Sequence, residues 1–114
     1  MASWDEVCEV VITAPDTEWL LQFTRDLVAD RLAASAHNLA EIRTVYRWEG
    51  EVHDAPEARS MIRTRRALVD AITARAMERH PYVVPSVVAT PLVGGNPDYL
   101  NWIITETQDP ANSD

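Results

Sequence analysis

The hydrophobic period of this chain changes repeatedly along its length, and this alternation constrains the fold more than any other feature. Residues 7–13, 39–48 and 83–92 are rich in β-branched side chains or alternate between apolar and polar ones, which predicts strands. Residues 17–34 and 66–79 carry apolar side chains three or four positions apart, which predicts amphipathic helices. Strand and helix patterns therefore alternate along the chain.

A long hairpin is predicted in the middle of the chain. Glu49–Gly50 forms a turn after the strand at 39–48, and the returning strand is interrupted at Pro56 before regular alternation resumes over 58–64. We expect the hairpin to be bulged or bent near Pro56. With Trp48 at its tip, it is too long to be covered by so short a chain, which predicts self-association.

The last part of the chain predicts a short third helix. Gly94–Gly95 is a turn, Asn96 is a strong N-cap residue, and Pro97 suits the first helical position. The polar segment that follows, 108–114, is expected to fray.

The resulting order is βαββαβ with a C-terminal helix, which predicts an α+β protein with a ferredoxin-like fold. We expect one domain over residues 1–114, with frayed tails at 1–6 and 108–114. Its antiparallel sheet would carry helices on one face only. Because the other face would stay uncovered, we expect a homo-oligomer.

Composition excludes several classes of site. All ten basic residues are Arg, which rules out a phosphate-loop lysine and a Schiff-base lysine, and a single Cys cannot form an internal disulfide or a four-Cys zinc site. A net charge of −8 disfavours nucleic acid as a partner and favours cations. The sequence has no apolar run of roughly 20 residues and no signal-peptide pattern at its start, so we expect no membrane partner and a cytoplasmic location.

Metal ligands are the first kind of candidate site. His53 lies among Glu51, Asp54 and Glu57, an oxygen-rich set with one imidazole that could hold copper or zinc loosely. The alternative is a solvated loop. His80 is a second candidate ligand, or else a residue that caps the end of the preceding helix.

A ligand cleft is the second kind. Trp48, Glu49 and Arg63 could line a small-molecule pocket between subunits, with His80 and Tyr82 at its mouth. The alternatives are interface ion pairs around a packed Trp and a rigid turn at His80. No nucleophile, base and orienting residue stand in a recognisable set, so we expect no enzymatic activity. Cys8, in the first strand, is expected to be a buried, inert thiol.

Five motifs in order between about Val10 and Thr105 resemble the CutA divalent-cation tolerance family. They are Thr13-Ala14-Pro15-Asp16, Arg31-Leu32-Ala33-Ala34, Tyr46-Arg47-Trp48-Glu49-Gly50, His80-Pro81-Tyr82 with Val84-Pro85, and Gly95-Asn96-Pro97-Asp98-Tyr99-Leu100 with Trp102-Ile103. The resemblance implies a ferredoxin-like subunit in a tight homotrimer, similar to P-II signalling proteins, with clefts between subunits. It further implies a role in tolerance of copper and other divalent metals, copper binding in some members, and no established enzymatic activity.

This chain departs from the family pattern at positions that bear on metal binding. Ser35 stands where the family usually carries Cys, which removes the soft ligand best suited to Cu(I). Arg63 replaces the usual Lys, Val83 stands where an acidic or polar residue often follows His-Pro-Tyr, and His37 replaces the common Asn or Thr.

We therefore expect a non-enzymatic homotrimer involved in divalent metal-ion tolerance, with no required cofactor and with weak metal binding through His53 and His80. The alternative is a P-II-like sensor that binds a small anion in the intersubunit cleft through Trp48, Arg63 and Tyr82 together with His80. A third hypothesis is a purely structural trimer.

Overall fold

The computed structural model describes residues 6–109 and has one antiparallel four-stranded sheet in the order β2-β3-β1-β4. The elements are β1 (Val7–Ala14), α1 (Thr17–Ala29), β2 (Ser35–Trp48), β3 (Glu51–Arg65), the 3₁₀ turn η2 (Arg66–Leu68), α2 (Val69–Arg79), β4 (Val87–Pro91) and α3 (Pro97–Glu106). Strand β3 lies between β1 and β2, the two strands of the first βαβ unit, and β1 lies between β3 and β4, the two strands of the second. This arrangement confirms the predicted ferredoxin-like α+β fold.

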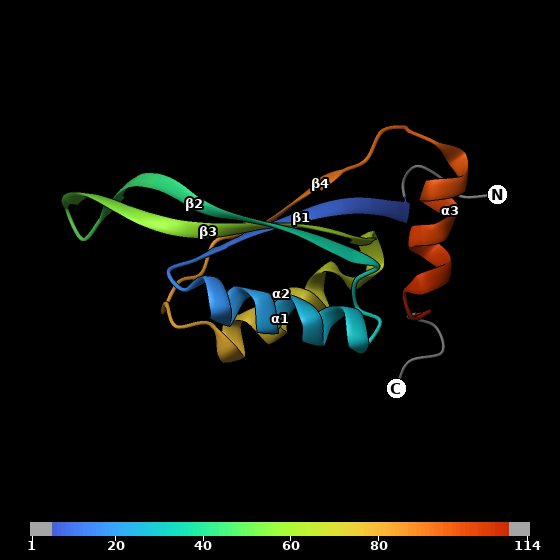
Figure 1. Ribbon diagram of the computed structural model, residues 1–114, viewed down its shortest axis with the longest axis horizontal. Coiled ribbons are helices and arrows are strands. Elements are labelled where there is room, and N and C mark those ends of the chain that lie inside the picture. Colours follow the sequence, from blue (N-terminus) through green and yellow to red (C-terminus); the bar gives the residue numbers. More distant parts are fainter. Residues whose placement is uncertain (1–5, 110–114) are drawn as a thin grey trace.

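One face of the sheet carries the core. Alternate residues of β1, such as Val10 and Ile12, are fully buried against α1 and α2, which lie along this face (Figure 1). On the opposite face, the register places His37, Met61, Val11 and Val88 in one row across all four strands. Helix α3 stands across one end of the sheet, and none of the described helices lies along the second face, so most of this face is uncovered as expected (Figure 1).

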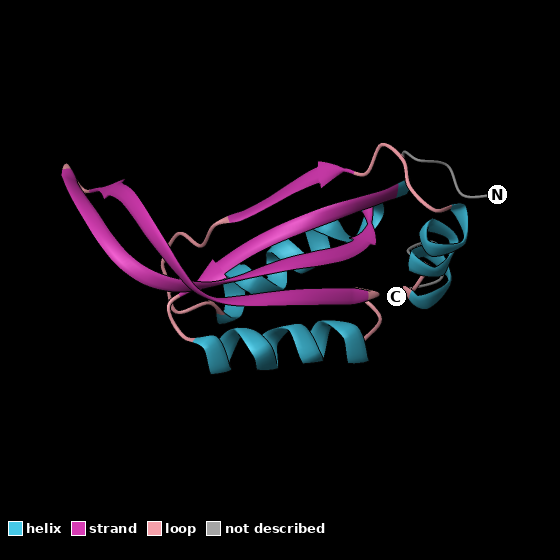
Figure 2. Cartoon of the chain, turned by 45° about the horizontal axis from the view of Figure 1, so that its top comes forward, coloured by secondary structure: helices cyan, strands magenta, loops and turns pink. Residues whose placement is uncertain are grey.

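The hairpin of β2 and β3 projects far beyond the rest of the sheet (Figure 2). The end of β1 at Ala14 pairs with Ala58, so residues 42–57 have no third strand beside them. The predicted bulge is present, but its extra residue lies in β2: the register shifts between Leu39 and Ile42. The expected interruption at Pro56 was wrong, because Pro56 pairs with Arg43 inside a continuous β3.

The predicted boundaries needed correction around α1 and β2. Helix α1 ends at Ala29 rather than at residue 34, because Arg31 adopts a left-handed φ of 60° and the amide of Ala34 donates to the carbonyl of Arg63. Strand β2 consequently begins at Ser35, four residues before the predicted start.

The second half needed smaller corrections. The first turn of the helix predicted from residue 66 is the 3₁₀ turn η2, and β4 spans only residues 87–91 because the preceding segment, with Pro85, forms a loop. The start of α3 is confirmed, since Asn96 accepts a hydrogen bond from the amide of Asp98 through its side chain.

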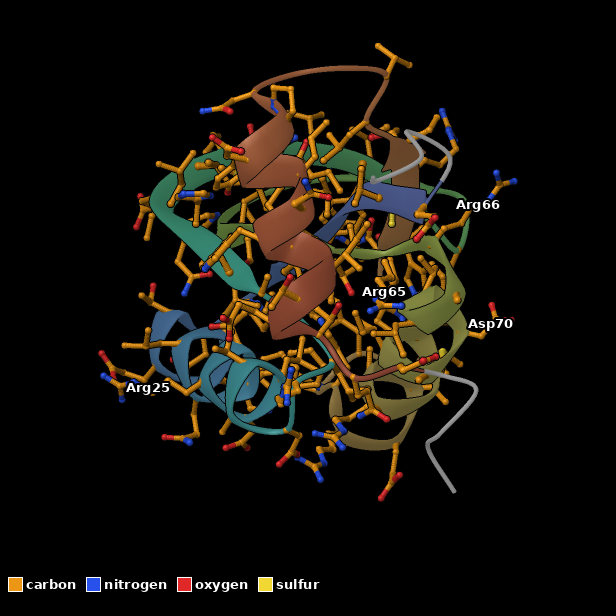
Figure 3. The ribbon with its side chains drawn as sticks, turned by 90° about the vertical axis from the view of Figure 1, so that its right-hand side faces the viewer. Arg25, Arg65, Arg66 and Asp70 are labelled. Carbon is orange, nitrogen blue, oxygen red and sulfur yellow. The ribbon has the colours of Figure 1, made fainter. Side chains whose placement is uncertain are left out.

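Two arginines fix the C-terminal end of α3. Arg31 donates to the carbonyls of Thr105 (2.7 Å) and Glu106 (3.1 Å). Arg65 donates to the carbonyl of Ile104 (2.8 Å) and the hydroxyl of Thr107 (3.0 Å), and its side chain points between α3 and α2 (Figure 3). Both cations thus meet the negative end of the helix dipole.

The frayed tails predicted at 1–6 and 108–114 fall mostly outside the described residues. Gln108 lies within them, and its amide donates to the carbonyl of Arg31 at 2.8 Å.

Candidate functional site

His80 and Tyr82 lie at the end of β1, where the chain leaves α2. The Nε2 atom of His80 is 2.8 Å from the carbonyl oxygen of Thr13, and its Nδ1 accepts from the amide of Tyr82 at 3.0 Å. Because Nδ1 is an acceptor, the contacts fit the tautomer in which Nε2 carries the proton and donates to the Thr13 carbonyl. His80 is 8 % exposed, and its ring packs in a T-shaped contact with the ring of Trp19, with the two ring centroids 4.9 Å apart. His80 therefore forms a rigid turn, and a metal could bind it only by displacing one of these two bonds.

The phenol of Tyr82 donates to Oε2 of Glu57 at 2.9 Å. Glu57 is only 5 % exposed and forms no ion pair within the described residues. Partial burial of the phenol, then the hydrogen bond and charge of Glu57, raise the pKa of Tyr82 to about 12. The sequence had suggested Glu57 as a neighbour of His53, and no local pattern indicates that it bonds Tyr82 instead.

His53 lies on the projecting hairpin and stacks on Tyr46 of the facing strand, with ring centroids 5.2 Å apart. Two of its three acidic neighbours in the sequence are engaged elsewhere: Asp54 forms an ion pair with Arg43, and Glu57 bonds Tyr82. Between residues 6 and 109, no three His, Cys, Asp or Glu side chains are grouped as metal ligands. A tightly bound metal needs several ligands at one place, and the described residues of a single chain do not provide them.

The five residues proposed for the cleft lie in three separate places. Trp48 and Glu49 are at the hairpin tip, His80 and Tyr82 are at its base with their rings 5.0 Å apart, and Arg63 is at the far end of β3. The 12 positions between Glu51, which pairs with Trp48, and Arg63 correspond to about 40 Å of extended strand. One chain alone therefore cannot form the whole cleft.

Arg63 lies between Ser35 and Glu9 of the neighbouring strands, on the second face of the sheet and close to α3. Its Nε is 3.5 Å from Oε1 of Glu9, too long for a hydrogen bond, and its guanidinium carbon is 5.9 Å from the centre of the Tyr99 ring. The buried Nε of Arg63 and the buried Oγ of Ser35 both lack a hydrogen-bond partner. The sequence singled out both positions, but only the strand register shows that they are opposite each other.

Cys8 and a surface cavity take no part in the contacts described above. Cys8 is buried as expected, and burial raises the pKa of its thiol to about 11. A cavity of about 660 Å³ lies between the end of α1 and α3, with Val28, Arg31 and Trp102 in its wall. None of the described helices is long and apolar enough to span a bilayer.

The sheet order and the projecting hairpin define a ferredoxin-like α+β protein with one uncovered sheet face. The family model described as CutA1 divalent ion tolerance protein matches residues 8–106, and the chain belongs to this family. It is 35 % identical to the divalent-cation tolerance protein CutA of Thermus thermophilus, over 86 % of this chain and 95 % of that protein. It is 37 % identical to the protein of that name from Pyrococcus horikoshii, over 87 % and 96 %.

Solved structures of the family agree with the fold. CutA1 from Oryza sativa superposes with a TM-score of 0.88 at 35 % identity, covering 91 % of this chain and 95 % of that one. The divalent cation tolerance protein from Thermus thermophilus has a TM-score of 0.87 at 33 % identity, with coverage of 90 % and 99 %.

Proposed function

We propose that this protein acts in the response to divalent metal ions as a homotrimer that binds metal weakly and catalyses no reaction. The match of the CutA1 divalent ion tolerance model to residues 8–106 is the observation that carries the metal-ion role. The net charge of −8 is consistent with it, because a negative surface concentrates cations. No cofactor is required in this proposal, and copper and zinc are the metals to be tested first.

Assembly is supported by surfaces that the chain leaves uncovered. Val45 and Val52 of the hairpin are each 65 % exposed, and Trp48 at its tip is 44 % exposed. Isolated two-stranded hairpins are marginally stable in water, so contact with further copies would stabilise this one. Assembly could also complete the proposed cleft. Trp48 and Arg63 are about 40 Å apart along the hairpin of one chain, so they could meet only when they come from different chains.

Weak metal binding is proposed through the imidazoles of His53 and His80. His53 is the more available of the two, since both ring nitrogens of His80 are hydrogen bonded. Titration of copper or zinc should therefore shift the NMR signals of His53 first and those of His80 only at higher metal concentration. If tenfold excess of either metal shifts neither imidazole, binding through these histidines is wrong.

A P-II-like sensor of a small anion is the second candidate function. Arg63 favours it, because its buried Nε lacks a hydrogen-bond acceptor and an anion is the natural partner of a guanidinium. Thermal-shift screening with nucleotides and organic acids tests this candidate. Stabilisation that Arg63→Met abolishes would support it, and no stabilisation by any of them at millimolar concentration would count against it.

The cytoplasm is proposed as the location. Related proteins are not confined to one compartment: a relative in Arabidopsis thaliana is named as chloroplastic, and a similar structure from Archaeoglobus fulgidus is named as periplasmic. Fractionation of the source cells, with immunodetection of the chain, tests this assignment.

A further inference from the structure

A row of four polar side chains crosses the sheet near α3. The strand register places side by side Ser35 of β2, Arg63 of β3, Glu9 of β1 and Thr90 of β4. Glu9 points away from the core because the next residue, Val10, is fully buried against the helices. Residues that face each other across strands share a face, so all four side chains lie on the second face of the sheet.

The charged pair in this row leaves its hydrogen-bonding groups unused. The Nε atom of Arg63 is 3.5 Å from Oε1 of Glu9, and neither side chain forms a hydrogen bond within residues 6–109. The hydroxyl of Ser35, on the other side of Arg63, also lacks a partner there. Unpaired polar groups of this kind are costly to bury. The side chains of Arg63 and Glu9 are still 28 % and 24 % exposed, so a ligand can approach both.

The two opposite charges indicate the class of ligand. A simple anion at Arg63 would be repelled by Glu9, and a simple cation at Glu9 would be repelled by Arg63. A zwitterion satisfies both groups. Its carboxylate can accept from the guanidinium of Arg63 and the hydroxyl of Ser35, while its ammonium donates to Glu9. In an α-amino acid a single carbon joins the carboxylate to the ammonium, which suits two protein groups that lie this close together.

The neighbours of the polar row indicate the side chain of the ligand. Two positions along the strands, about 7 Å away, the next row contains His37, Met61, Val11 and Val88. Three of these four are apolar, and they lie within reach of an aliphatic side chain. From α3, the ring of Tyr99 lies 5.9 Å from the guanidinium carbon of Arg63 and steadies it through a cation–π contact.

We propose that this row binds an α-amino acid with an aliphatic side chain. Arg63 and Ser35 bind its carboxylate, and Glu9 binds its ammonium. Met61 and Val11 contact its side chain. The ligand differs in class from the metal ion and from the small anion of the two candidate functions above, so the inference goes beyond both.

Isothermal titration calorimetry of the full chain with L-leucine tests this site. Isocaproate lacks only the ammonium of leucine, and isoamylamine lacks only its carboxylate, so each can form only one of the two charged contacts. We expect each to bind at least about tenfold more weakly than leucine, because one charged group of the protein stays unpaired. Glycine, which has no side chain to contact Met61 and Val11, should also bind more weakly than leucine.

Three variants change the contacts to the carboxylate and the ammonium. Arg63→Met and Glu9→Gln should each weaken leucine binding at least about tenfold, and Ser35→Ala about threefold. Arg59→Met is the matched control, because Arg59 lies on the same face of β3 as Arg63 and forms no ion pair within the described residues. It should change binding less than about twofold. Circular dichroism and the oligomeric mass establish whether each variant is folded. Ser35→Ala removes a single oxygen and tests the site if the charge variants do not fold.

Two results would overturn the inference outright. One is no binding of leucine at millimolar concentration, and the other is equal binding to the native chain and to the folded variants. If isocaproate binds as tightly as leucine and Glu9→Gln leaves its binding unchanged, the site takes a simple anion, so the amino-acid inference fails while the anion-sensor function stands. The metal-ion function depends on the His53 titration and is unaffected by any of these results.

Discussion

The hydrogen bond from Tyr82 to Glu57 makes a quantitative prediction about stability. Tyr82→Phe deletes the phenol oxygen and leaves a carboxylate that is 5 % exposed without its donor. Hydrogen bonds to charged groups contribute about 1.5–3 kcal/mol, and the phenol is itself 36 % exposed, so water replaces part of the loss. We therefore expect Tyr82→Phe to lower the free energy of unfolding by about 1–2 kcal/mol.

The assay is urea unfolding at one fixed protein concentration, because assembly makes apparent stability depend on concentration. Tyr46→Phe is the matched control: Tyr46 stacks on His53, so losing its hydroxyl should change stability by less than about 0.5 kcal/mol. In a double-mutant cycle with Glu57→Met, we expect a coupling of about 1 kcal/mol. A coupling near zero, or equal effects of the two Tyr→Phe changes, would refute the assigned role of this bond.

Four further predictions follow from other contacts. The pKa of Tyr82 is raised to about 12, so the stability gained from keeping this phenol protonated is complete below pH 10 and is lost as the pH rises from 10 to about 12. A titration followed by tyrosinate absorbance should show one phenol that ionises late, and Tyr82→Phe should remove it. The buried thiol of Cys8, whose pKa is raised to about 11, should react with a thiol reagent only after unfolding, and rapid reaction of the native chain would contradict its burial. Arg65→Leu should cost about 2 kcal/mol in denaturant unfolding because it releases the end of α3, whereas Arg66→Leu, at the neighbouring exposed position, should cost less than about 0.5 kcal/mol. Trp48→Ala should shift the assembly toward monomer in sedimentation, and an unchanged mass at low micromolar concentration would show that the hairpin tip makes no subunit contact.

Elements with a strong local signal were predicted well from the sequence. The run Val7–Thr13 predicted β1 to within one residue, and Asn96 and Pro97 predicted the start of α3, because strand pattern and caps depend on neighbouring residues only. The end of α1 was missed because Leu32 continues the helical period although it packs into the core from outside the helix. Nothing local indicates the left-handed backbone of Arg31 that ends the helix.

The candidate site was predicted only in part. His80 and Tyr82 were singled out by their motif, and they lie together because two positions separate them in the chain. Glu57 is 25 positions from Tyr82, and Ser35 is 28 positions from Arg63, so each pairing depends on tertiary structure and strand register. Contacts of this kind carry no periodic signal in a single sequence.

The most direct test of the central claim is the mass of the purified protein in solution, measured by sedimentation equilibrium at low micromolar concentration. The proposed homotrimer would cover the exposed sheet face and hairpin, and it would bring together the proposed cleft residues that one chain holds apart. Three chains of 12.8 kDa give a predicted mass of about 38 kDa. A mass near 12.8 kDa across the concentration range would contradict the claim that the functional form is a homotrimer.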